Sequence, residues 1–159
     1  MSKSSSAYTK ARANANQFIN DVRIGKNVKI SPFVNLYECE LDDDVFIGPF
    51  VEIQAGVKVG AGSRIQSHSF ICSHVTIGKN VFVGHGVKFI NDKYPRMARE
   101  WKPLKTTVED NASIGTNATI MPVRIGSWAM VGAGAVVTKD VHNGSTVVGN
   151  PAKIIDSGI

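Results

Sequence analysis

An apolar residue recurs every sixth position through most of this chain. Counted from Leu41, nine such positions in a row are apolar: Leu41, Ile47, Ile53, Val59, Ile65, Ile71, Ile77, Val83 and Phe89. The residues four places after the first eight are all Val or Ser: Val45, Val51, Val57, Ser63, Ser69, Val75, Val81 and Val87. A period of six fits neither a helix, with about 3.6 residues per turn, nor a plain alternating strand. It fits a short strand followed by a turn, repeated many times.

The same rhythm continues on both sides of this central run. It occupies Ile24, Ile30 and Leu36 upstream, and Val108, Ile114, Ile120, Ile125, Val131 and Val137 downstream, with one shortened step before Leu41 and another before Ile125. Val148 and Ile154 are expected to close the series. One unit cannot bury its apolar residue alone, but stacked units share a continuous core. The sequence therefore predicts an all-β repeat fold.

Several segments resemble the hexapeptide-repeat acyltransferases, namely "IGKNVKI", "IGPFVEI", "IGKNVFVGHGV", "ASIGTNATI", "VGAGAVVTKDV" and "VVGNPAKII". The resemblance implies a left-handed parallel β-helix over residues 22–155, with three hexads in each coil and one long inserted loop at 93–107. It also implies a homotrimer that uses acetyl-CoA as co-substrate. Residues 1–21 match no motif and are expected to cap the first coil or to be disordered, and residues 156–159 form a tail.

One longer stretch, "SHSFICSHVTIGKNVFVGHGVKFIND", narrows the resemblance. It is similar to the branch that N-acetylates nucleotide-linked amino sugars, especially dTDP-3-amino-3,6-dideoxyhexoses. The function implied is an acetyl-CoA-dependent N-acetyltransferase whose product feeds bacterial surface polysaccharides such as the lipopolysaccharide O-antigen. The nucleotide, the hexose, the ring position of the amine and the length of the acyl group stay open.

Three hexads per coil would place residues 18 apart on the same face, one coil apart. The contacts expected on this basis are His68 beside the column of His85, Ser73 beneath Asn91 and His74 beneath Asp92. If the loop inserts without changing face, Thr116 and Ala133 continue the column above His85. His85 is the candidate base that takes a proton from the amine, directly or through water, because an imidazole exchanges protons near neutral pH. Asn91 is a candidate to hold the amine or a sugar hydroxyl, and Asp92 is a candidate to hold the amine or to orient His74. A backbone N–H near Thr116 or Ala133 is the expected oxyanion donor.

Other readings of these residues stay open. A free amine is already a good nucleophile, so a protein base need not contribute much. His68 and His74, taken here as substrate-binding, occupy turn positions where a polar side chain often bonds only to backbone.

The rhythm breaks over "KYPRMAREWKPLKTT", which carries two prolines and five Lys or Arg residues. Loops of this length are often functional. The resemblance implies a loop that reaches across the cleft between subunits, with Lys93, Tyr94, Arg96 and Trp101 contacting substrate. The plain alternative is a solvated insertion.

The segments "GAGAVVTKDV" and "GNPAKII" match the part of the family that lies along coenzyme A. The resemblance implies a cofactor-binding set of Thr116, Ala133, Lys139, Asn150, Pro151 and Lys153. Small residues would let pantetheine approach the backbone, and the lysines would meet its phosphates. For the lysines, solubility is an equally simple explanation.

Composition limits the class of ligand, the redox compartment and the membrane association that can be expected. The formal net charge of +5 suits an anionic, phosphate-bearing ligand, but neither an aromatic-and-basic stripe nor zinc-finger spacing is visible along the sequence, so nucleic acid is not expected. Cys39 and Cys72 are too few for a disulfide scaffold and predict reduced thiols in the cytoplasm. The first residues lack the apolar stretch of a signal peptide, and no apolar run approaches a membrane span, so no membrane association is expected.

Three alternative functions remain. O-acetylation of a sugar or small alcohol would depend far more strongly on a base at His85. A γ-type carbonic anhydrase would need three zinc-binding histidines with a closely spaced pair, whereas His68, His74 and His85 are six and eleven residues apart, so no metal is expected. A non-catalytic scaffold would leave the two segments matching the coenzyme A region unexplained.

Overall fold

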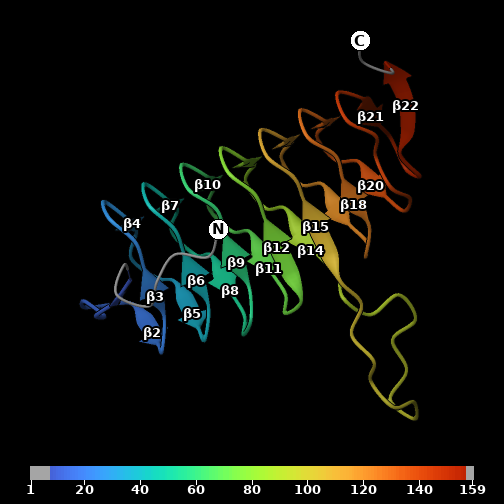
Figure 1. Cartoon of the computed structure of the whole chain (residues 1–159). Coiled ribbons are helices and arrows are strands. Elements are labelled where there is room, and N and C mark those ends of the chain that lie inside the picture. The colour runs from blue at the N-terminus through green and yellow to red at the C-terminus, as the bar shows by residue number, and fades with distance from the viewer. Residues whose placement is uncertain (1–7, 157–159) are drawn as a thin grey trace.

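The computed structural model describes residues 8–156, so the first seven residues of the N-terminal extension and residues 157–159 of the tail lie outside it. The chain winds into a left-handed parallel β-helix, a stack of triangular coils with one long loop hanging from its side (Figure 1). Residues 8–156 contain strands but no helix, so this part of the chain has no helix that could cross a membrane. The predicted fold class is confirmed.

Each coil contributes one short strand to each of three flat faces, which we number in the order in which a coil visits them. Face 1 contains β1 (Thr9–Lys10), β3 (Arg23–Ile24), β6 (Glu40–Leu41), β9 (Lys58–Val59), β12 (Val75–Ile77), β15 (Thr106–Val108) and β18 (Arg124–Ile125). Face 2 contains β4 (Lys29–Ile30), β7 (Phe46–Ile47), β10 (Arg64–Ile65), β13 (Phe82–Val83), β16 (Ser113–Ile114), β19 (Met130–Val131), β21 (Thr146–Val148) and β22 (Lys153–Asp156). Face 3 contains β2 (Phe18–Asn20), β5 (Asn35–Tyr37), β8 (Glu52–Ile53), β11 (Phe70–Ile71), β14 (Lys88–Phe89), β17 (Thr119–Ile120) and β20 (Val136–Val137).

The six-residue repeat sets which side chains point inward. The nine apolar positions from Leu41 to Phe89 are all buried, and those after the loop, from Val108 to Val137, are buried as well. The residues four places later pack beside them at the corners. Ser63 and Ser69 take this place without leaving a polar group unpaired, since their hydroxyls donate to the carbonyls of Gly78 and Gly84 at 2.8 and 2.9 Å.

Glycine is required where adjacent coils approach most closely. Gly60 lies under Gly78 in the coil above, and a Cβ atom on Gly60 would come within 2.5 Å of the Gly78 carbonyl group. The corners also need left-handed backbone, which Asn adopts more easily than most residues. Asn27, Asn80 and Asn111 meet this need at the corner between faces 1 and 2.

The two ends of the stack depart from the regular winding. At the first end β2, which lies within residues 1–21, pairs in parallel with β5 as part of the stack, while β1 lies antiparallel to β3. At the other end β22 turns back antiparallel to β21. The expected closing positions are wrong here: Val147 rather than Val148 is buried, and Ile154 is 52% exposed because its strand runs along the edge instead of starting a new coil.

The long loop leaves the stack after β14 and returns at β15, at the corner between faces 3 and 1 (Figure 1). The coils on either side of it remain in register, because Val83 pairs with Ile114 and Ile77 with Val108. The chain therefore resumes on the next face in the regular order, which is the assumption that places Thr116 above His85.

Candidate functional site

His85 projects from the corner between faces 2 and 3, where β13 ends. The register of β13 with β16 and of β16 with β19 places Thr116 and then Ala133 above it, in the predicted column. The Ser67 hydroxyl, one coil below, lies 2.8 Å from Nδ1 of His85. That contact leaves Nε2 directed away from Ser67 and fixes the ring. Ser67 was missed by the sequence reasoning, although it lies 18 residues before His85 and the repeat alone could have identified it.

The side chains of the column above His85 become smaller toward the top of the stack, from Thr116 to Ala133. Ala133 is exposed, and a Cβ atom added to Gly134 would meet nothing within 4 Å, so a ligand can come close to the backbone there. Asn150 and Pro151, joined by a cis peptide bond, follow β21 near the same corner, and Gly149 accepts a backbone hydrogen bond from Val136. The uppermost coils thus present a strip of small residues to solvent.

The two lysines of the predicted cofactor set lie apart from each other. Lys153 begins β22 at the top of face 2, close in sequence to Asn150 and Pro151. Lys139 follows β20 and therefore lies at the corner between faces 3 and 1, away from the column above His85. Both side chains are exposed. Only Lys153 is at the end of the strip of small residues.

His68 occupies the turn just below His85 but packs downward. Its ring stacks on Phe50 with centroids 4.8 Å apart, and Phe50 stacks on Phe33 at 5.2 Å. His68, Phe50 and Phe33 all have positive φ. The backbone carbonyl of His68 accepts a hydrogen bond from Lys88. The ring of His68 therefore forms the top of an aromatic ladder along this corner, and its expected contact with substrate remains a prediction.

Asn91 and Asp92 begin the long loop at the corner between faces 3 and 1. The Asn91 amide donates to the backbone carbonyl and hydroxyl of Ser73 at 3.2 and 2.9 Å, which is the predicted coil-to-coil contact. The Asp92 carboxylate accepts from the backbone N–H of Tyr94 at 3.0 Å and pairs with Arg99. Both contacts use Oδ1 of Asp92 and shape the loop, and the expected roles of Asp92 toward the amine and His74 stay predictions.

The loop carries its predicted contact residues on its outside. Tyr94 and Trp101 are 66% and 56% exposed, and Lys93 lies over the Tyr94 ring at 6.0 Å. Arg96 is exposed as well. The Trp101 ring meets His74 edge to face, with centroids 6.5 Å apart, so the base of the loop is anchored on the stack while its outer part extends into solvent.

The predicted site residues therefore form two groups on one chain. His85, His68, Thr116 and Ala133 lie at the corner between faces 2 and 3, whereas His74, Asn91, Asp92 and the loop lie at the corner between faces 3 and 1. The width of face 3 separates them. Within residues 8–156, no three His, Cys, Asp or Glu side chains converge in a manner suited to a metal ion.

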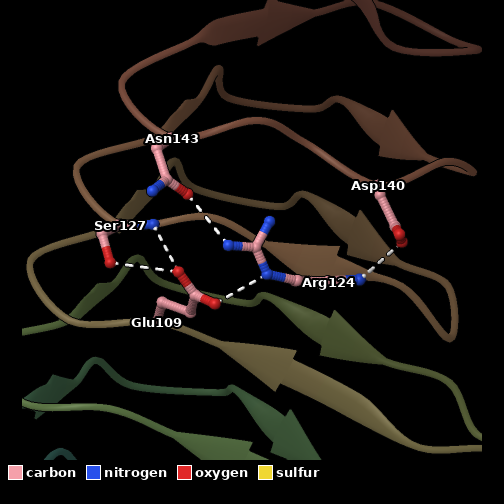
Figure 2. Close-up of polar contacts among 5 residues, drawn as sticks. All are labelled: Glu109, Arg124, Ser127, Asp140 and Asn143. Carbon is pink, nitrogen blue, oxygen red and sulfur yellow. Dashed lines mark hydrogen bonds and ion pairs between the residues drawn. The ribbon is translucent and has the colours of Figure 1, made fainter.

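A further polar cluster links the upper coils near the corner between faces 1 and 2 (Figure 2). Arg124 donates from Nε to Glu109 at 2.6 Å and from its guanidinium to Asn143 at 3.0 Å, and its backbone N–H donates to Asp140. The other Glu109 oxygen accepts from the backbone and hydroxyl of Ser127, both at 3.1 Å. The bond from Arg124 is the main reason that the pKa of Glu109 lies below its usual value of 4.5.

Two family descriptions match the chain. "Bacterial transferase hexapeptide (six repeats)" matches residues 38–73, and "Hexapeptide repeat of succinyl-transferase" matches residues 105–139. The bifunctional protein GlmU of Thermotoga maritima is 30% identical over 163 aligned residues, which cover 86% of this chain but only 37% of GlmU. The chain thus spans little more than a third of that relative.

Two solved structures share the architecture. A hexapeptide-repeat acetyltransferase from Vibrio cholerae, complexed with acetyl-CoA, is 27% identical with a TM-score of 0.66, covering 74% of this chain and 69% of that one. A mutant of AntD, an N-acyltransferase from Bacillus cereus in complex with dTDP and coenzyme A, has a TM-score of 0.73 at 20% identity, covering 89% and 85%. The second likeness concerns the fold alone.

Proposed function

Because the chain belongs to the bacterial hexapeptide-repeat transferases, we propose that it transfers an acetyl group from acetyl-CoA to the amino group of a nucleotide-linked sugar. The acceptor we favour is a dTDP-3-amino-3,6-dideoxyhexose, and the product would enter surface polysaccharide synthesis. The choice of acceptor rests on the sequence segment around His85. The Vibrio cholerae relative, solved with acetyl-CoA, supports the choice of donor.

The observation that carries the proposal is the column above His85. An exposed imidazole held by Ser67 lies directly below a strip of small residues that ends in Ala133 and Gly134. A thioester on an extended pantetheine arm can lie along such a strip, since Ala133 is small and a Cβ atom on Gly134 would meet nothing within 4 Å. The acetyl group would then reach the level of His85.

The Ser67 contact indicates how His85 would act. For Nε2 to accept a proton, Nδ1 must carry the ring hydrogen and donate it to the Ser67 oxygen. The amine nitrogen attacks the thioester carbonyl carbon and loses a proton to Nε2. As the C–S bond breaks, Nε2 of His85 returns that proton to the departing sulfur. A backbone N–H of the column above His85 would stabilise the oxyanion.

A homotrimer is part of the proposal, since one chain keeps His85 and the long loop on separate corners. A second copy that presents its loop to the His85 corner would bring the two groups together and cover the ligands. The outward position of Tyr94 and Trp101 supports this arrangement, because large aromatic side chains on a loop are costly to leave in water.

The test is thiol release from acetyl-CoA with a panel of dTDP- and UDP-linked 3-amino and 4-amino sugars, each beside its hydroxyl analogue. We expect turnover with one amine and none with its hydroxyl partner. His85→Asn should reduce turnover while acetyl-CoA binding persists. Unchanged turnover of His85→Asn over a pH series would exclude His85 as the base.

The Ser67–His85 contact also favours a second candidate, O-acetylation of a sugar hydroxyl. An alcohol is a poor nucleophile until a base removes its proton, and an oriented imidazole is such a base. Turnover of the hydroxyl member of a pair, with complete dependence on His85, would identify this activity in place of the first.

A further inference from the structure

A hollow lies at the base of the long loop, on the side of the stack away from His85. It has a volume of about 290 Å³ and is lined by Ala55, Gly56, His74, Thr76 and Lys105. Two of these residues, Ala55 and Gly56, are small, and a Cβ atom on Gly56 would meet nothing within 4 Å, so the backbone is accessible there. The Trp101 ring meets His74 at its margin.

The return of the loop creates this hollow. Val75 pairs with Thr106, and the Thr106 N–H donates to the His74 carbonyl at 3.0 Å, so the preceding residue, Lys105, comes next to His74. Thr76 is the exposed centre of β12 on face 1, between Lys58 below and Thr107 above. Three hydrogen-bond donors from two coils therefore surround one space.

The positive charge of Lys105 is not balanced by an acid of the hollow. Arg99 and Lys102 of the loop pair with Asp92 and Glu100, but no ion-pair partner for Lys105 occurs among residues 8–156. None of the five lining residues is acidic. An ammonium group, an imidazole N–H and a hydroxyl beside two small residues are a donor set suited to a tetrahedral oxyanion.

We infer that this hollow binds a phosphoryl group of the substrates, through Lys105, His74 and Thr76. The inference rests on the proposed function, in which both the nucleotide-linked sugar and coenzyme A carry phosphates. Trp101 lies at the margin, where a ring attached to that phosphoryl group could pack against it. The loop would thus be a direct part of ligand binding and not only a cover.

The experiment measures binding without catalysis. The full-length protein is titrated by calorimetry with inorganic pyrophosphate, dTDP and CoA, as wild type, Lys105→Gln and Thr76→Val. Lys29→Gln is the control, because Lys29 is also an exposed lysine but lies on β4 of face 2, outside the hollow. Far-ultraviolet circular dichroism confirms that each variant is folded.

We expect Lys105→Gln to weaken pyrophosphate binding about tenfold or more and Thr76→Val to weaken it several-fold, with Lys29→Gln within about twofold of wild type. A parallel loss for dTDP assigns the phosphoryl group to the nucleotide sugar, and a parallel loss for CoA assigns it to the coenzyme. Either result supports the hollow as a phosphoryl site. Equal affinity of wild type and Lys105→Gln for all three probes, or no binding by wild type, would overturn it.

The two proposals can fail separately. If the amino-sugar panel is acetylated but Lys105→Gln binds every probe normally, the hollow is not the phosphoryl site and the proposed function stands. If no sugar of the panel is acetylated but pyrophosphate binding depends on Lys105, the phosphoryl site stands and the acceptor must be sought elsewhere.

Discussion

The Ser67 hydroxyl lies 2.8 Å from Nδ1 of His85, and the two residues belong to successive coils. A serine in this place fixes both the tautomer and the orientation of the ring when Nε2 accepts a proton. Replacement of Ser67 by Ala leaves Nδ1 to water and lets the ring rotate. We expect turnover to fall about tenfold, with little change in the KM for acetyl-CoA.

Ser67→Thr retains the hydroxyl and should recover most of the lost turnover. Ser113→Ala is a suitable control, because Ser113 lies on face 2 of a neighbouring coil, away from His85. Steady-state kinetics over a pH series would check the role. If Ser67→Ala retains wild-type turnover and the same pH profile, Ser67 does not position the base.

Glu109 should make the stability of the protein depend on pH. Its bond to Arg124 lowers the pKa of the folded carboxyl below the ordinary 4.5. Its stabilising effect is therefore complete above that value and is lost as the pH falls through the lower folded pKa. Since the side chain is 29% exposed, we expect Glu109→Gln to lower the free energy of unfolding by about 1 kcal/mol or less near neutral pH.

Urea unfolding near pH 7 and near pH 3 tests this expectation. The difference between wild type and Glu109→Gln should shrink toward the acid end, as protonation removes the charge of Glu109. A gap of the same size at both values would mean that Glu109 acts through packing and not through its charge.

Both cysteine thiols should be unreactive toward thiol reagents in the folded protein. Burial raises the pKa of Cys39 to about 12 and that of Cys72 to about 11, so almost no thiolate exists near neutral pH. A colourimetric disulfide reagent should react with neither thiol in the native state and with both in denaturant. Rapid labelling of the native protein would show that the coils holding these residues open readily.

Gly60 should be among the least replaceable residues of the stack. A Cβ atom there would come within 2.5 Å of the Gly78 carbonyl, so Gly60→Ala must push two coils apart. We expect a loss of about 2 kcal/mol or more. Gly134→Ala is the matched comparison, because Gly134 has φ 70° but open space around it, and should cost about 1 kcal/mol.

Thermal and urea unfolding of the two glycine variants would separate steric contact from backbone conformation. A larger loss for Gly134→Ala than for Gly60→Ala would contradict the close approach of the two coils.

Much of the fold was predictable because the repeat is local and strict. Leu41, Ile47 and Ile53 recur at one spacing and are all buried, as stacked repeat units require, and the family resemblance added that three such units make one coil. An 18-residue coil correctly predicted the Ser73–Asn91 contact, and with the further assumption that the loop does not change the face it also predicted the column of Thr116 and Ala133 above His85. The ends were less predictable, since Val147 and Ile154 depend on a strand that turns back.

The sequence by itself determined an all-β repeat fold and the place of the loop, because both follow from counting the repeat. The resemblance to the hexapeptide-repeat family supplied the three hexads per coil and, with them, the expected stacking order of His85. Only the tertiary structure decided which residues the two ends of the loop contact. Lys105 reaches His74 only because Thr106 pairs with Val75, and Asp92 is drawn into the loop by Arg99. After the loop, the register of the chain is set by backbone hydrogen bonds between strands that are distant in sequence. A local sequence pattern does not show at which residue those bonds resume.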